Sequence, residues 1–346
     1  METDLQLRMV SHQSTPMITT LSPSQETETP TYAEVSPPQK GQKPRNFIEA
    51  NTESVSLVHL KNDCIIPVFR DNEKTISHYE FADAVEFSAK HFFKGAEILS
   101  PEIRVSHQIN GRIPQALHKK VNELEEWEKT RYYERMMFIV EIPSITENVN
   151  GNNLNLTVGG VRALNHESLF SKKSIEKFKV FIGFKNLICT NLLISTDGAA
   201  LDIRVSSYDD LIRATLDLFS QYSVSKHLQA MRNFGNYELT EHQFAQIIGK
   251  SRLYQHLPTV QKKEIPLLDF NDSQINTIAH DYYHDRSFCR AENGNIDIWK
   301  LYGLFTGSNK SSYIDSFLNR AVGAHSFSQG LVDALEGNNT FNWFLS

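Results

Sequence analysis

The chain has 346 residues, of which 40% are hydrophobic and 22% are charged. This composition is ordinary for a globular protein and excludes a collagen-like or wholly disordered chain. Its 35 Lys and Arg against 41 Asp and Glu give a net charge of −6. That balance excludes a uniformly basic nucleic-acid binder, but it leaves room for a local basic face. No run of about 18 apolar residues is present, so we expect no membrane span and no membrane partner.

The spacing of the cysteines and the composition of the first residues indicate in which cellular compartment the protein is expected. Cys64, Cys189 and Cys289 are far apart and form no CxxC pair, which argues against a zinc ribbon, a thioredoxin-like motif and a disulfide framework. The first ten residues contain no apolar stretch of the kind found in signal peptides. We therefore expect a reducing, cytoplasmic location.

Residues 1–45 differ in composition from the rest of the chain. They are rich in Ser, Thr, Gln and Pro and contain few apolar residues. Such a segment cannot bury enough apolar surface to offset the entropy of ordering it. We predict a disordered tail over 1–45.

Residues 46–205 are predicted to form an α+β domain with a mainly antiparallel sheet. Runs of β-branched and aromatic residues predict strands over 64–69, 135–145, 154–163, 178–190, 192–195 and 201–205. Asn150-Gly151 is the preferred dipeptide of a type I′ hairpin turn, expected here inside a longer loop over 147–153.

Two helices are predicted to pack on this sheet. Ser77 and Glu80 form a capping-box pattern that starts the first helix. Its inward residues should be Phe81, Ala84, Val85 and Ser88. The charged stretch 119–135 is predicted as the second helix.

Residues 206–346 change to helical periodicity, which predicts an all-helical lobe. Ser207, Thr240 and Asn271 each begin an N-terminal capping pattern, and further helices are expected over 296–305 and 311–322. Gly249 is expected to end the helix that follows Thr240. Gly307 is expected to end the helix over 296–305, with the next helix starting at Lys310.

A basic segment is the strongest candidate binding site. Between residues 162 and 185, six basic residues stand against only two glutamates, with phenylalanines interleaved. The basic residues are Arg162, Lys172, Lys173, Lys177, Lys179 and Lys185. If Lys177, Lys179 and Lys185 share one sheet face, phosphates could lie along it while an exposed aromatic ring stacks on a base. Strand alternation also fits a purely structural interpretation, in which the phenylalanines enter the core and the lysines form a solvated face.

A weaker candidate is the pair His280 and His284, which are four residues apart and so lie on one helix face. Zinc proteases hold their metal with this spacing, using a Glu after the first His. Here Asp281 stands in that position, and a third ligand would have to come from elsewhere. The alternative is an ordinary solvated helix face.

Other chemistry-bearing patterns are not supported. The segment from Gly303 to Ser311 lacks the Walker spacing, because Lys310 lies three positions after Gly307. No G-x-S-x-G motif is present. We therefore predict no catalytic residues and no cofactor.

Several longer segments resemble an uncharacterised family. Residues 62–69, 101–108, 178–184 and 309–315, with the terminal Trp343–Ser346, are similar to domain-of-unknown-function family thirty-eight seventy-one over about residues 46–346. Cys189-Thr190-Asn191 and Trp299–Thr306 resemble the C-T-N and W-x-L-Y-N-x-x-T signatures of the broader phage/plasmid-like family, with Gly303 where that pattern has Asn. The resemblance implies a mobile-element context and an intracellular, DNA-related role, and it supplies no catalytic residue.

Three functional hypotheses follow. The first is a non-enzymatic protein that binds single-stranded nucleic acid through the basic segment, with an annealing-type role and assembly into homo-oligomers. The second is an interaction, regulatory or counter-defence factor that binds a protein partner through the helical lobe. The third is a metal-dependent hydrolase that uses His280 and His284.

Overall fold

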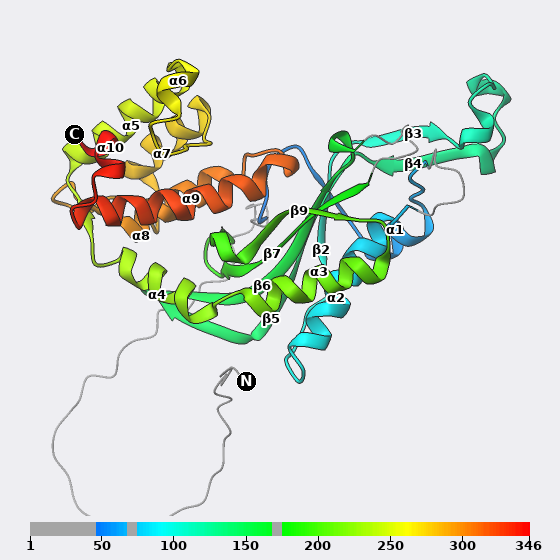
Figure 1. Ribbon diagram of the computed structural model, residues 1–346, viewed down its shortest axis with the longest axis horizontal. Helices are drawn as coiled ribbons and strands as arrows, with labels where there is room; N and C mark the ends of the chain where they lie inside the picture. Colours follow the sequence, from blue (N-terminus) through cyan, green and yellow to red (C-terminus); the bar gives the residue numbers. More distant parts are fainter. Residues whose placement is uncertain (1–45, 68–74, 168–174) are drawn as a thin grey trace, which may run out of the picture. The chain divides into compact units, whose positions relative to one another are not determined.

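The computed structural model describes residues 46–67, 75–167 and 175–346. Residues Arg45–Ser346 form one compact unit, in which an antiparallel sheet is followed by helices (Figure 1). The expected α+β class is confirmed. The predicted tail, residues 1–45, lies outside the described residues. Among the described helices, none is both long and apolar enough to cross a bilayer.

The sheet has seven strands in the order β1-β2-β5-β6-β7-β8, and β9 pairs with β7 beside β8. Every pairing is antiparallel. The strands are β1 (Glu53–Val55), β2 (Glu102–Val105), β5 (Arg135–Val149), β6 (Asn152–Ala163), β7 (Glu176–Asn186), β8 (Leu192–Leu193) and β9 (Ala199–Val205).

The β5–β6 hairpin closes on the predicted dipeptide. Asn150 and Gly151 have φ values of 48° and 79°, the left-handed pair that a type I′ turn requires. The longer loop expected over 147–153 is wrong, because Val149 already pairs with Asn152. The side-chain amide of Asn150 donates to the Met231 carbonyl at 2.8 Å, so this turn also anchors the helix that carries Met231.

Both faces of the sheet are covered. On one face, Phe81 of α2 (His78–Phe92) packs against Phe138 and Phe178. On the other face, Met137 and Phe181 belong to a separate cluster with residues of α9 (Ile314–Leu335). Figure 1 shows α2 and α3 (Tyr208–Gln221) on one side and α9 on the other. Burial on both faces explains why the strand sequences are almost continuously apolar.

The expected helix starts are confirmed. The capping box of Ser77 and Glu80 is present, and all four predicted inward residues of α2 are buried. Ser207, Thr240 and Asn271 each cap the helix that follows them. The remaining elements include α4 (Val224–Phe234), α5 (Glu241–His256), α6 (Thr259–Lys262), α7 (Asp272–His284), α8 (Ile298–Asn309), α10 (Asn342–Leu345) and the short strand pair β10 (Glu238–Leu239) and β11 (Ile296–Asp297). One apolar core runs from the sheet into these helices, and a division into two lobes at residue 205 stays a prediction.

Two predicted helix ends are wrong. Helix α5 passes through Gly249 to His256, because its buried stripe continues with Ser251 and Tyr254. Helix α8 passes through Gly307 to Asn309, and α9 begins only at Ile314. In each case, packing of the flanking residues outweighs the cost of about 1 kcal/mol for a glycine inside a helix.

The predicted helix over 119–135 is also wrong. This stretch forms short 3₁₀ turns followed by β4 (Lys129–Tyr133), which pairs with β3 (Gln108–Arg112). We call residues 108–133 the arm (Figure 1). Val121, Leu124 and Trp127 have helical spacing, but none of them is buried, so no packing stabilises a helix here. Thr130, Tyr132 and Tyr133 favour a strand.

The strand predicted over 64–69 does not form in residues 64–67, the part that the structure describes. Cys64–Pro67 follow α1 (Leu57–Asn62) in an irregular conformation, and Val68 and Phe69 lie outside the described residues. The Ile65 N–H donates to the Arg131 carbonyl at 2.8 Å, which holds this segment against the base of the arm.

Candidate nucleic-acid interface

Arg162 is not an exposed cation. Its side chain is fully buried and forms a bidentate pair with Glu167 at 3.1 and 3.2 Å. A second carboxylate, Glu176, lies 3.4 Å away, and the guanidinium lies over the Phe178 ring. Arg162 also donates to the Ile76 carbonyl, which precedes α2. These contacts remove Arg162 from the predicted set of phosphate ligands and make it a structural cation.

The buried cluster of Arg162, Glu167 and Glu176 joins three parts of the fold. It links the end of β6, the segment before α2 and the start of β7. Lys172 and Lys173, two of the predicted ligands, lie outside the described residues. In the sequence they stand between Glu167 and Glu176, the two carboxylates that Arg162 holds.

Lys185 is also occupied. Its ammonium contacts the Glu141 carboxylate and lies 3.7 Å from Glu102, and its side chain is only 11% exposed. Two carboxylates therefore compensate its charge within the sheet. Lys185 lies on the same face of β7 as Lys177 and Lys179, as alternation requires, but Phe181 lies between them and packs beneath α9.

Lys177 and Lys179 line one cavity of about 360 Å³ on the sheet face that α9 covers. We call it the Lys177 cavity. Val161 and Leu201 contribute apolar walls, and His166 stands at the cavity as a third basic group. The cavity therefore combines two neighbouring ammonium groups with an imidazole.

The two lysines differ in their surroundings. The Lys179 ammonium donates to the Asp315 carbonyl at 2.8 Å and to the Asn319 side-chain oxygen at 2.7 Å, both neutral acceptors. Burial lowers the pKa of Lys179, while the charges of Asp315, Asp202 and Asp269 act in the opposite direction. Lys177 is half-buried, and no described carboxylate lies within ion-pair distance of its ammonium.

Arg204 joins this site although it is distant in sequence from the basic segment. The pairing of β9 with β7 places Arg204 directly opposite Lys177. Arg204 contacts Asp202, a carboxylate at the cavity, at 2.8 to 3.1 Å. This contact lowers the pKa of Asp202 and compensates its negative charge. A count of charges between residues 162 and 185 misses Arg204, which only strand pairing brings here, and His166, which is counted as neutral.

The interleaved phenylalanines do not supply an exposed ring. Phe178, Phe181 and Phe184 are at most 1% exposed, and Phe170 lies outside the described residues. An exposed ring is offered by Tyr313, just before α9 and 68% exposed. The Arg135 guanidinium lies over this ring at 6.0 Å and 3.3 Å from Asp315, whose carboxylate is also 3.9 Å from His166. Tyr313 therefore borders the same charged cluster.

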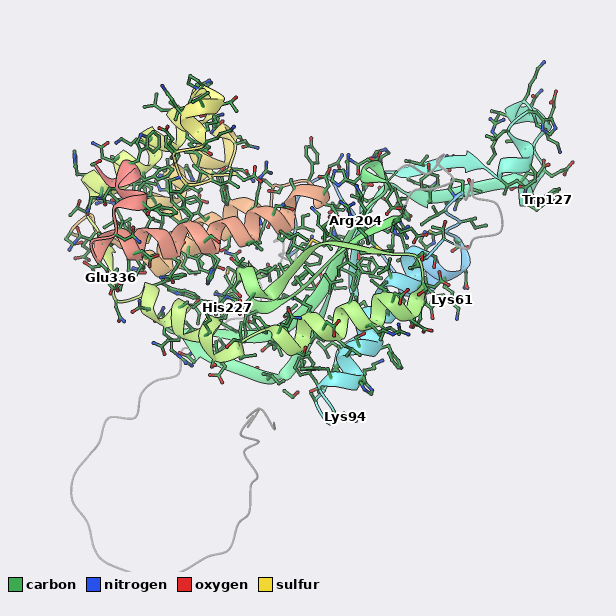
Figure 2. All side chains as sticks on the ribbon, viewed as in Figure 1. Lys61, Lys94, Trp127, Arg204, His227 and Glu336 are labelled. Carbon is green, nitrogen blue, oxygen red and sulfur yellow. The ribbon has the colours of Figure 1, made fainter. Side chains whose placement is uncertain are left out.

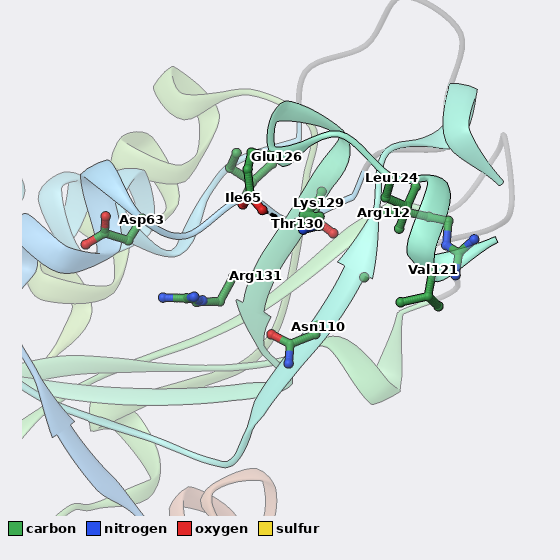
Figure 3. Close-up of a pocket in the computed structure, with 11 residues that line it drawn as sticks. Asp63, Ile65, Asn110, Arg112, Val121, Leu124, Glu126, Lys129, Thr130 and Arg131 are labelled. Carbon is green, nitrogen blue, oxygen red and sulfur yellow. Dashed lines mark hydrogen bonds and ion pairs between the residues drawn. The ribbon is translucent and has the colours of Figure 1, made fainter. Parts of the chain in front are cut away.

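A second, larger cavity of about 740 Å³ runs along the arm, from Asp63 and Ile65 at its base to Val121 and Leu124 (Figure 3). Arg112, Lys129 and Arg131 project from β3 and β4, and Asp63 and Glu126 also line the cavity. Lys129 is 2.5 Å from Glu126, and Arg112 donates to the Lys119 carbonyl. Of these three cations, only Lys129 is therefore paired with a carboxylate among the described residues.

The histidine pair lies as the helical spacing predicts. His280 and His284 are exposed on α7, with ring centroids 4.6 Å apart. His280 bonds to the adjacent Asp281 at 2.8 Å. Within residues 46–67, 75–167 and 175–346, no cluster of three or more His, Cys, Asp or Glu could hold a metal ion.

The motifs that carry the family resemblance meet in a buried polar junction. The Asn191 side chain donates to the Gly303 carbonyl and the Thr306 hydroxyl, both at 3.0 Å. Lys310 donates to the Cys189 carbonyl and, at 2.8 Å, to the Thr190 hydroxyl. These contacts tie the β7–β8 turn to α8 and its C-terminus. The motifs therefore hold elements together, and Lys310 does not head a phosphate loop.

The chain belongs to the family described as "Domain of unknown function, B. Theta Gene description (DUF3871)", whose model matches residues 31–345. No curated protein and no solved structure matches the chain.

Proposed function

We propose that this protein binds single-stranded nucleic acid at the Lys177 cavity and has no enzymatic activity of its own. The observation that carries the proposal is the position of Lys177 and Lys179 at one cavity beside His166, with Arg204 opposite Lys177. Basic groups held on rigid strands suit a phosphate backbone, because each contact releases condensed counterions.

The charges of the site support an anionic ligand. Asp202 is compensated by Arg204, and Lys179 is held by a carbonyl and an amide oxygen. Lys177 has no described carboxylate within ion-pair distance. The net field at the cavity therefore favours an anion, although the whole chain carries a charge of −6.

The exposed Tyr313 ring favours a single strand over a duplex. Proteins that bind single strands combine basic groups along the backbone with an aromatic face on which a base can stack, and a base within a duplex is not free to do so. Tyr313 offers such a face beside Arg135 and close to the cavity residues. An annealing-type role and a mobile-element setting remain predictions from the resemblance.

The test is fluorescence anisotropy with labelled oligothymidylate, titrated at several salt concentrations between about 50 and 200 mM. Wild-type protein should bind with an affinity that falls as salt rises. Lys177→Glu should weaken binding about tenfold or more, equivalent to about 1.4 kcal/mol or more. Tyr313→Ala should weaken binding with little change in the salt dependence, because it removes stacking and leaves the phosphate contacts.

The matched control is Lys94→Glu, which makes the same change in net charge. Lys94 is an exposed lysine just after α2, on the opposite side of the sheet (Figure 2). It should leave binding unchanged. Absence of binding by wild-type protein at low salt would reject the proposal, as would equal effects of the two reversals. The alternative role as an interaction or regulatory factor predicts a protein partner and indifference to Lys177→Glu.

A further inference from the structure

The tip of the arm exposes apolar side chains that nothing described in the same chain covers. Leu117, Val121 and Trp127 are 55%, 72% and 69% exposed. Figure 2 shows Trp127 at the outer end of the arm, beyond the paired strands. A two-stranded ribbon is marginally stable by itself, and isolated apolar clusters of this kind mark contact sites.

The tip carries a small excess of negative charge. Glu123 and Glu125 are exposed beside Trp127, whereas Glu126 pairs with Lys129 and Glu128 is buried against Lys119. Over residues 117–129, four glutamates stand against three lysines. An apolar tip with this charge suits a surface that is both apolar and basic.

The end of α5 and the segment that includes α6 carry such a surface. Leu253, Val260 and Leu267 are 60%, 73% and 74% exposed. Over residues 250–267, which we call the corner, four Lys or Arg stand against one Glu. Arg252 is paired with Asp272 at 2.6 Å, so the remaining basic residues are Lys250, Lys262 and Lys263. The Lys262 ammonium binds only neutral groups among the described residues, the Gln255 carbonyl at 2.8 Å and the Tyr254 ring, so its charge is not compensated by a carboxylate.

The tip and the corner lie at opposite ends of residues Arg45–Ser346 and cannot meet within one chain (Figure 1). We propose that the tip of the arm of one copy docks on the corner of a second copy. The charge signs are opposite and each surface presents exposed apolar side chains. Because the two surfaces differ, the contact is head-to-tail, and it builds a ring or an open filament instead of a symmetric dimer.

The experiment measures the mass of the assembly by light scattering after size-exclusion chromatography, at high micromolar concentration. Wild-type protein should be larger than a dimer. Trp127→Asp disrupts the apolar surface of the tip, and Val260→Asp disrupts that of the corner. Each variant alone should therefore be monomeric. Both positions are exposed, so circular dichroism and melting temperature should match those of wild-type protein.

The decisive sample is the equimolar mixture of the two variants. Each variant retains the docking surface that the other has lost, so the mixture should form a one-to-one dimer and nothing larger. A monomeric wild-type protein would overturn the proposal. So would a mixture that stays monomeric while wild-type protein assembles, because that result indicates a tip-to-tip contact or another interface. Nucleic-acid binding by the monomeric variants is measured separately, so failure of this inference leaves the proposed function intact.

Discussion

Replacing Arg162 by methionine should lower the free energy of unfolding by about 3–5 kcal/mol, the range for breaking a buried ion pair. The substitution removes the bidentate contact to Glu167, the contact to Glu176 and the bond to the Ile76 carbonyl. Both glutamate side chains are 1% exposed, so water cannot replace the guanidinium. Methionine fills a similar volume, which keeps the cost of a cavity small.

Urea denaturation followed by circular dichroism measures this loss. With a slope of about 3 kcal/mol/M, the unfolding midpoint should fall by about 1 M or more.

A matched variant separates charge from packing. Arg162→Met combined with Glu167→Gln and Glu176→Gln leaves no buried charge in the cluster and should regain part of the lost stability. A loss below about 1 kcal/mol for Arg162→Met would refute the reasoning, since that is the range of exposed ion pairs.

Two further predictions concern the core. Burial lowers the pKa of His325 to about 4 and that of His78 to about 3, so the folded state keeps both rings neutral. Stability should be fully present above about pH 6.5, the unfolded value, and should fall as the pH drops towards 4, with His325 accounting for about 3 kcal/mol. Urea midpoints of wild-type protein and His325→Gln across this range test it, and equal slopes would contradict it. Gly160→Ala should cost about 1–3 kcal/mol, because its Cβ would lie 2.3 Å from the Phe81 ring; calorimetry measures the loss, and Gly249→Ala, whose Cβ would meet open space, is the control that should not be destabilised.

Local patterns identified most of the secondary structure because the physical cause was itself local. Ser77 with Glu80 and Asn150-Gly151 satisfy backbone groups or adopt left-handed dihedrals within a few residues. The arm was mistaken for a helix because its charges resembled a solvated helix. Its pairing depends on β3, about twenty residues earlier, which no local rule registers.

The candidate site shows the same division between local patterns and contacts with distant residues. The α+β class, the β5–β6 hairpin and the concentration of basic residues between 162 and 185 follow from local sequence patterns. Which of these charges remain available depends on the fold, because a cation is neutralised by whatever carboxylate the fold brings to it. Arg162 meets two buried glutamates, and Lys185 meets the partly exposed Glu141. Lys177 meets no carboxylate within ion-pair distance in the described residues, and a strand pairing places Arg204 opposite it.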